Sequence, residues 1–322
     1  MKNKFLEIFK ITLLLFIFTK TYASHNDICK NLFDEHGNAT LGLTNLLAIT
    51  EARINGPKNI LNVCYSPDVK EWRDHPGTER WNLTLKNNLK NKDLNIIKIC
   101  ENELGIKGTV LPKKVKYSGI LFLGASFNSV LNRVEFYNKL IKGNIIDKEL
   151  KIWILTGKRD LDEKAGETKK NFLELVPAGQ KPLPLPPDEQ SMIKFIFHYK
   201  IPKETKVEYI YSEKELNHTR ATTASTVYAW AAKIPNPPHK TYYLGISNQP
   251  YVTYQESVIN LTLQEASKKN IEVHVIGEEE RPREDTNNYA AILLDTISKI
   301  ISNCNKLFLL NRNSHSIPSV EL

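Results

Sequence analysis

Five short apolar runs alternate with helical patterns in this chain, and this alternation constrains its fold more than any other feature. The runs are rich in branched and aromatic residues, and they comprise Gly119–Leu123, Lys151–Leu155, Val207–Tyr211, Thr241–Ile246 and Ile271–Ile276. Repeated strand–helix alternation favours a parallel sheet with helices on both of its faces. The first, second and fourth runs are apolar enough to be covered on both sides. The pattern predicts an α/β domain over residues 114–304.

A different pattern precedes the sheet, over residues 24–113. Apolar residues between positions 43 and 54 fit one helical face, and the sequence Asn-Gly-Pro at 55–57 ends that helix. We therefore expect a mostly helical N-terminal segment that packs on the α/β domain. Residues 305–322 are expected to form a C-terminal tail, which is polar and loose from Asn311 onward.

Residues 1–23 have the composition of a secretory signal peptide. Lysines precede an apolar run over 11–18, and Ala23 provides a small residue at the expected cleavage site before Ser24. The run is too short to span a bilayer, which takes about 20 apolar residues; the alternative is an uncleaved N-terminal anchor. No later run is long enough for a transmembrane segment. The protein is thus expected to be periplasmic or secreted.

The charges of the chain do not point to a nucleic-acid partner. The formal net charge is +8, and the lysines and the single glutamate of residues 1–23 supply +3 of it, which leaves +5. The remaining charges are interspersed and form no basic stripe with interleaved aromatic residues, which nucleic-acid binding favours.

The four cysteines of the chain are Cys29, Cys64, Cys100 and Cys304. Their wide spacings contain no CxxC motif, so no metal site is expected. An even count in an exported protein permits two disulfides, and the alternative is four small buried apolar residues. Cys64 and Cys100 both lie in the N-terminal segment, so they are the predicted pair if disulfides form.

Ligands of doubly wound sheets bind beyond the carboxyl ends of the strands, so the residues that follow each run are candidates. Gly124-Ala125-Ser126 follows the first run, and small residues that lead into a helix let backbone N–H groups approach an anion. Gly157-Lys158-Arg159 follows the second run. A glycine beside two cations can hold a phosphate or a carboxylate, and the alternative is a solvated turn.

The third and fourth runs are also followed by polar residues. Thr219 and Arg220 come after the third run, where Thr219 either caps the next helix or contacts a ligand, and Arg220 reaches the crevice. Ser247 and Gln249 come after the fourth run. They either bind a small molecule or make the turn into a helix that begins at Pro250.

The connection between Leu155 and Asp188 is unusually long. It holds a charged segment, predicted to be helical over residues 163–175, followed by five prolines between 177 and 187. Connections of this length are often functional lids or insertions, and the alternative is a stiff surface linker.

Several of these positions, taken in order, resemble a known family. The landmarks are the strand and turn at Gly119–Gly124, Arg133 in the following helix, Thr156-Gly157, Asp188-Glu189 before Met192, Thr219, and Ile246-Ser247. Residues 117–277 resemble the YdcF/SanA-like domain of bacterial envelope proteins. The resemblance implies a Rossmann-like fold, a role in cell-wall or barrier maintenance, and a nucleotide-like or S-adenosylmethionine-like ligand. No cofactor is identified.

The chain departs from this family at positions that bear on catalysis. Ala221-Thr222 stands where the family has a Glu-Asn pair, and Pro250-Tyr251 stands where many members have a histidine. His218 is nearby in sequence, and the alternative is that it is an exposed loop residue. The chain has no Ser-His-Asp order, HExxH motif or paired-carboxylate spacing. Glu189 remains the candidate catalytic carboxylate.

The leading prediction is an exported protein that binds a small anionic, nucleotide-like or glycan-linked ligand at the carboxyl edge of its sheet. Positive charge is expected from Arg133, Lys158, Arg159 and Arg220, and close backbone approach from Gly124 and Gly157. One alternative is a hydrolase or transferase that acts on cell-wall precursors. The other is a secreted interaction protein that uses the α/β domain as a scaffold and the N-terminal segment and proline-rich loop as its partner surface.

Overall fold

The computed structural model describes residues 29–73, 78–213, 221–279 and 284–315. The predicted signal peptide, residues 1–23, lies outside these ranges, and so do His218, Thr219 and Arg220.

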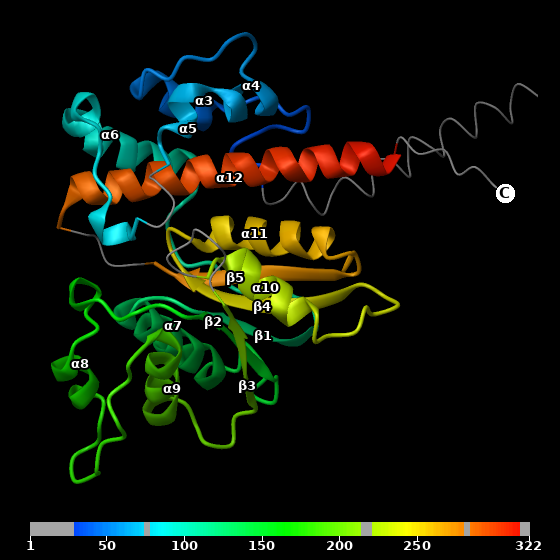
Figure 1. The fold of residues 1–322 in the computed structure, drawn as a ribbon. Helices are drawn as coiled ribbons and strands as arrows, with labels where there is room; N and C mark the ends of the chain where they lie inside the picture. Colours follow the sequence, from blue (N-terminus) through cyan, green and yellow to red (C-terminus); the bar gives the residue numbers. More distant parts are fainter. Residues whose placement is uncertain (1–28, 74–77, 214–220, 280–283, 316–322) are drawn as a thin grey trace, which may run out of the picture.

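Five parallel strands form one sheet in the order β3-β2-β1-β4-β5 (Figure 1). The strands are β1 (Tyr117–Leu123), β2 (Ile152–Gly157), β3 (Val207–Ser212), β4 (Thr241–Asn248) and β5 (Ile271–Glu278). Strand β1 lies in the centre, where Ile120, Leu121 and Phe122 are fully buried, as expected of a strand covered on both faces. The sheet confirms the predicted α/β class with a Rossmann-like arrangement.

Helices cover both faces of the sheet because successive strand residues point to opposite sides. Phe122 belongs to the core under α7 (Phe127–Lys142) and α9 (Glu189–Lys200). Its neighbour Leu121 belongs to the core under α10 (Thr223–Ala231) and α11 (Val252–Glu265). Because successive side chains of β1 point to opposite faces, this single strand contributes to two hydrophobic cores.

A third core lies beyond α11 and contains α12 (Thr286–His315). Figure 1 shows α12 between α11 and the N-terminal helices. Those helices are α3 (Leu41–Ile49), α4 (Ile60–Tyr65), α5 (Pro67–Lys70) and α6 (Asp93–Lys98). Leu43, Leu46 and Ile96 share this core with Ile297 of α12, so the predicted helical N-terminal segment packs mainly on α12. The helix continues past residue 305, the predicted start of the tail, because its apolar face continues to the buried Leu307.

Shorter helical turns complete the structure: η1 (Arg80–Asn82), η2 (Asn87–Lys92), the π-helical η3 (Ile99–Glu103), η4 (Glu163–Ala165) and α8 (Lys169–Glu174). The helix predicted over residues 163–175 is divided into η4 and α8. Gly166 lies between them with a φ of +77°, a left-handed conformation that a glycine adopts readily and that ends η4.

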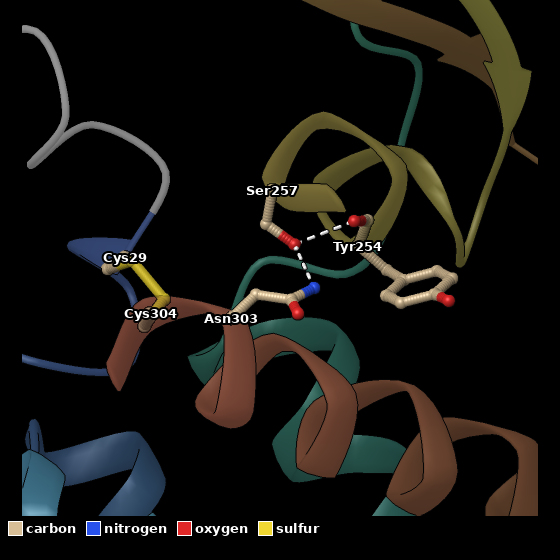
Figure 2. Close-up of a disulfide and its surroundings, with 5 residues drawn as sticks. All are labelled: Cys29, Tyr254, Ser257, Asn303 and Cys304. Atoms are coloured by element: carbon tan, nitrogen blue, oxygen red, sulfur yellow. Dashed lines mark hydrogen bonds between the residues drawn. A yellow bond between two sulfur atoms is a disulfide. The ribbon is translucent and has the colours of Figure 1, made fainter. Parts of the chain in front are cut away.

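One disulfide joins Cys29 to Cys304 on α12 (Figure 2). Near it, Asn303 donates a hydrogen bond to the hydroxyl of Ser257, so α12 is also held to α11. The predicted pairing of Cys64 with Cys100 is wrong: both are free thiols buried among apolar side chains, and burial raises the pKa of each. Proximity in sequence was a poor guide because α12 returns to the N-terminal segment from far along the chain.

Removing this disulfide is expected to destabilise the protein by about 2–4 kcal/mol, because the bond restricts the unfolded chain. The variant is the double substitution Cys29→Ala with Cys304→Ala, and the measurement is denaturant unfolding with and without reductant. Reductant should lower the stability of the unmodified protein and leave the variant unchanged. Equal stability of the reduced and oxidised protein would contradict the prediction.

Candidate functional site

The order in which the chain adds strands to the sheet reverses at the centre, between the parallel strands β1 and β4. From β1 the sheet grows outward through β2 and β3, and the chain then returns to place β4 on the other side of β1. The connection after β1 enters α7 on one face, and the connection after β4 enters α11 on the opposite face. The two connections therefore diverge at the carboxyl edge, and such a topological switch point is where doubly wound sheets bind ligands.

Arg133 joins the ends of β1 and β4 beneath this point. Its side chain is 1% exposed. Its guanidinium donates to the backbone oxygens of Leu123, at 2.6 Å, and Gly124, at 3.2 Å, and to Oδ1 of Asn248, at 2.9 Å. Arg133 lies at the site as predicted, but its hydrogen bonds within the chain give it a positioning role. It fixes the spacing of the two strand ends.

Both helices that begin at the switch point lack a side-chain cap. Ser126 precedes α7 and Tyr251 precedes α11, and neither side chain accepts a hydrogen bond from the first turn. Helix α6 also lacks a cap but continues directly from η2. The other described α-helices begin with an accepting side chain, from Thr40, Asn59, Ser66, Thr168, Asp188, Thr222 and Asp285. Uncapped first turns present N–H donors and partial positive charge.

Buried polar atoms without partners lie on the connection from β4 to α11. Gln249 is 4% exposed and Tyr251 is 2% exposed. The amide nitrogen of Gln249 donates to the backbone oxygen of Gly108, but its Oε1 has no partner among the described residues. The hydroxyl of Tyr251 likewise has none there. Buried polar groups of native proteins are usually satisfied, so these two atoms are candidates for a ligand or ordered water.

Arg80 of η1 brings a cation to the same connection. Its guanidinium carbon lies 3.5 Å from the centre of the Tyr251 ring, a cation–π contact. Asn288 of α12 donates hydrogen bonds to the backbone oxygens of Arg80 and Leu83, so α12 holds this turn in place. Arg80 is a candidate site residue that the sequence pattern does not single out, because it lies far from every strand end in sequence.

A buried charge cluster lies beside the switch point, at the end of β2. Arg159 forms ion pairs with Glu167 and with Glu189, and all three side chains are nearly inaccessible. Burial alone would lower the pKa of Arg159, but hydrogen bonds and charges from both carboxylates hold it above its ordinary value. Oε1 of Glu189 packs so close to Gly124 that an added Cβ would lie 2.5 Å away. The cluster therefore adjoins the turn after β1.

Trp81 attaches the N-terminal segment to this cluster. Its indole nitrogen donates to Oδ2 of Asp162 at 3.0 Å, and its ring centre lies 6.0 Å from the guanidinium carbon of Arg159. Arg80 and Trp81 are adjacent in sequence and contact the two sides of the site, near α11 and near β2 respectively. Residues outside the α/β domain thus complete its carboxyl edge.

The remaining predicted site residues differ in their exposure and in what surrounds them. Ala125 and Ser126 are half-buried at the start of α7, Lys158 is exposed, and Ser247 is buried. The space beside Gly157 is filled by Ala221 and not left for a ligand. A Cβ added at Gly157 would lie 2.3 Å from the Cβ of Ala221. Thr219 and Arg220 fall outside the described residues.

The site has few groups suited to proton transfer. Oε2 of Glu189 accepts a hydrogen bond from Nε of Arg159 at 2.8 Å, so this carboxylate is engaged within the protein. Within the described part of the chain, no three His, Cys, Asp or Glu side chains group as a metal site would require.

None of the described helices combines the length and the apolar character needed to cross a bilayer.

Comparison with protein-family models, with curated proteins and with solved structures finds no significant match to this chain.

Proposed function

We propose that the protein binds a small anionic ligand, nucleotide-like or glycan-linked, at the carboxyl edge of its sheet. The observation that carries this proposal is the pair of uncapped helix starts, α7 and α11, on the two sides of the switch point. Their N–H donors and aligned peptide dipoles favour a phosphate or carboxylate group. Arg80 adds a full positive charge beside α11.

The buried polar atoms favour a ligand that also carries hydroxyl groups. Oε1 of Gln249 accepts a hydrogen bond, and the hydroxyl of Tyr251 both donates and accepts. A sugar or ribose hydroxyl beside a phosphate matches this combination of groups. The half-buried Ala125 and Ser126 leave the backbone of the first turn of α7 close to such a ligand.

The proposal includes export and a role in maintenance of the bacterial envelope. The signal-like composition of residues 1–23 and the resemblance to YdcF/SanA-like domains support it. The disulfide between Cys29 and Cys304 agrees with an oxidising compartment, since such bonds are rare in the cytosol. A hydrolase or transferase gains no comparable support, because its candidate carboxylate, Glu189, is held by Arg159.

Ser126→Asp tests the site through two effects of opposite sign. The added carboxylate should cap α7 and stabilise the free protein by about 0.5–1 kcal/mol, and its charge should repel an anionic ligand. The probes are UDP-N-acetylglucosamine and inorganic pyrophosphate, and the measurement is denaturant unfolding with each. At a hundred times its Kd, a probe should stabilise the unmodified protein by about 2.7 kcal/mol and leave Ser126→Asp almost unaffected.

Asn59→Asp is the matched control, because it adds the same charge at the capped start of α4, away from the sheet edge. Its response to both probes should equal that of the unmodified protein. The proposal fails if neither probe stabilises the unmodified protein, or if Ser126→Asp responds as strongly as the control.

A further inference from the structure

The proline-rich part of the long connection between β2 and α9 protrudes from the domain. Figure 1 shows it as a green loop between α8 and α9 that extends away from the sheet. Its base is fixed by a bridge between Asp160 and Asp188 and by the ion pair of Arg159 with Glu189. Gly179 has a φ of +81° and nothing within 4 Å of an added Cβ, so the turn before this segment is open to solvent. The loop is thus anchored at its base and exposed further out.

The backbone of residues 181–187, Lys-Pro-Leu-Pro-Leu-Pro-Pro, is restricted at nearly every position. Each proline fixes its own φ near −65°, and each residue before a proline is pushed towards extended conformations. Every residue from 181 to 186 either is a proline or precedes one. Residues 181–186 accordingly have neither helix nor strand, which agrees with a polyproline II conformation. The segment is ordered before it meets any partner.

A polyproline II helix has three residues per turn, so residues 181–187 form three edges. Leu183 and Pro186 share an edge that the protein covers only in part. Pro186 is buried, and the backbone N–H of Leu183 donates to the hydroxyl of Tyr199, but the side chain of Leu183 is 39% exposed. The other two edges are exposed. One carries Lys181, Pro184 and Pro187, and the other carries Pro182 and Leu185. Leu185 is 41% exposed, although it is a large apolar residue.

We propose that residues 181–187 are a docking segment for a partner protein with an aromatic-lined groove for polyproline II helices. Such grooves bind ridges of proline and aliphatic side chains, and a preformed helix loses little entropy on binding. The spacing of Lys181, Pro184 and Pro187 along one exposed edge specifies a carboxylate at one end of that groove, which pairs with the lysine. This function is independent of the ligand site at the sheet edge.

A purified SH3 domain that selects a basic residue before a PxxP sequence is the probe, and its titration against the full chain is followed by calorimetry and NMR. Saturable binding is expected, with shifts of the aromatic groove residues of the probe. The double substitution Pro184→Ala with Pro187→Ala should weaken binding by about tenfold or more, since a few central contacts carry most of the affinity. Both prolines are exposed, so the fold should be preserved.

Two further variants separate recognition of this segment from general effects of proline. Lys181→Glu leaves the prolines in place, and it should weaken binding and reverse its salt dependence. Pro235→Ala with Pro238→Ala changes two exposed prolines of another loop that lacks the lysine spacing, and it should bind like the unmodified chain. Absence of saturable binding, or equal loss in the control variant, overturns the proposal.

Discussion

Arg159→Ala is expected to destabilise the protein by about 3–5 kcal/mol, the usual cost of leaving a buried charge without its partner. The substitution leaves two carboxylates, Glu167 and Glu189, in a site from which water is almost excluded. It also removes the guanidinium that holds the base of the long connection against the start of α9. Denaturant unfolding at neutral pH measures the loss.

The loss should depend on pH in a direction that identifies its cause. In the folded variant the two carboxylates lack the guanidinium that offsets their burial, and a buried charge without that compensation costs free energy that protonation removes. The stability deficit of the variant relative to the unmodified protein should therefore shrink as the pH falls. A deficit that is constant with pH would show that lost packing, and not unpaired charge, is the cause.

Two comparisons control this experiment. Lys158→Ala removes the neighbouring cation, which is exposed, and should change stability by less than about 0.5 kcal/mol. The triple substitution Arg159→Met, Glu167→Gln and Glu189→Gln removes the charges together. It should recover part of the stability that Arg159→Ala loses, because replacing a whole buried ion-pair cluster costs less than removing one member.

Arg133→Ala should also cost about 3–5 kcal/mol, through lost hydrogen bonds and a buried cavity. The backbone oxygens of Leu123 and Gly124 and the amide of Asn248 lose their donor in the interior. Arg133→Lys should restore only a minor part, since an ammonium group cannot reproduce the planar fork. Unfolding measurements on both variants test this, with the exposed Asn132→Ala on the same helix as the control. Arg133→Lys with full stability would contradict the geometry.

The strands could be predicted from sequence because their signal is local. Strands such as β1 and β2 are buried on both faces, and a short apolar run such as Ile120–Leu123 is typical of a central strand of a parallel sheet. The end of the first helix was less predictable. The helical spacing of apolar residues continues to Ile54, but α3 ends at Ile49, and the chain turns at Glu51, which has a positive φ.

The location of the candidate site was also predictable, whereas the roles of its residues were not. Strand ends of a parallel sheet converge at one edge, so Gly124, Ser126 and Gln249 could be selected from their positions alone. The sequence pattern predicts that Arg133 contacts a ligand, but its helical phase places it between Val130 and Val134 on the apolar face of α7. This phase was the available signal that the guanidinium is buried.

Contacts between distant parts of the chain account for what the sequence pattern missed. Arg80 reaches Tyr251, and Cys29 reaches Cys304, because α12 returns along the N-terminal segment. No local pattern of residues 24–113 identifies that partner, since an amphipathic helix shows which face is buried but not what covers it.

The sharing of one core by the N-terminal helices and α12 has a consequence for biosynthesis. Leu43 and Leu46 are synthesised roughly 250 residues before Ile297, the residue of α12 that packs in the same core. At about 5–20 residues per second, translation takes more than ten seconds to cover that interval. Until then the N-terminal helices lack the surface that buries them, and chains that terminate early expose apolar side chains. Chaperones and proteases can therefore distinguish an incomplete chain from a finished one.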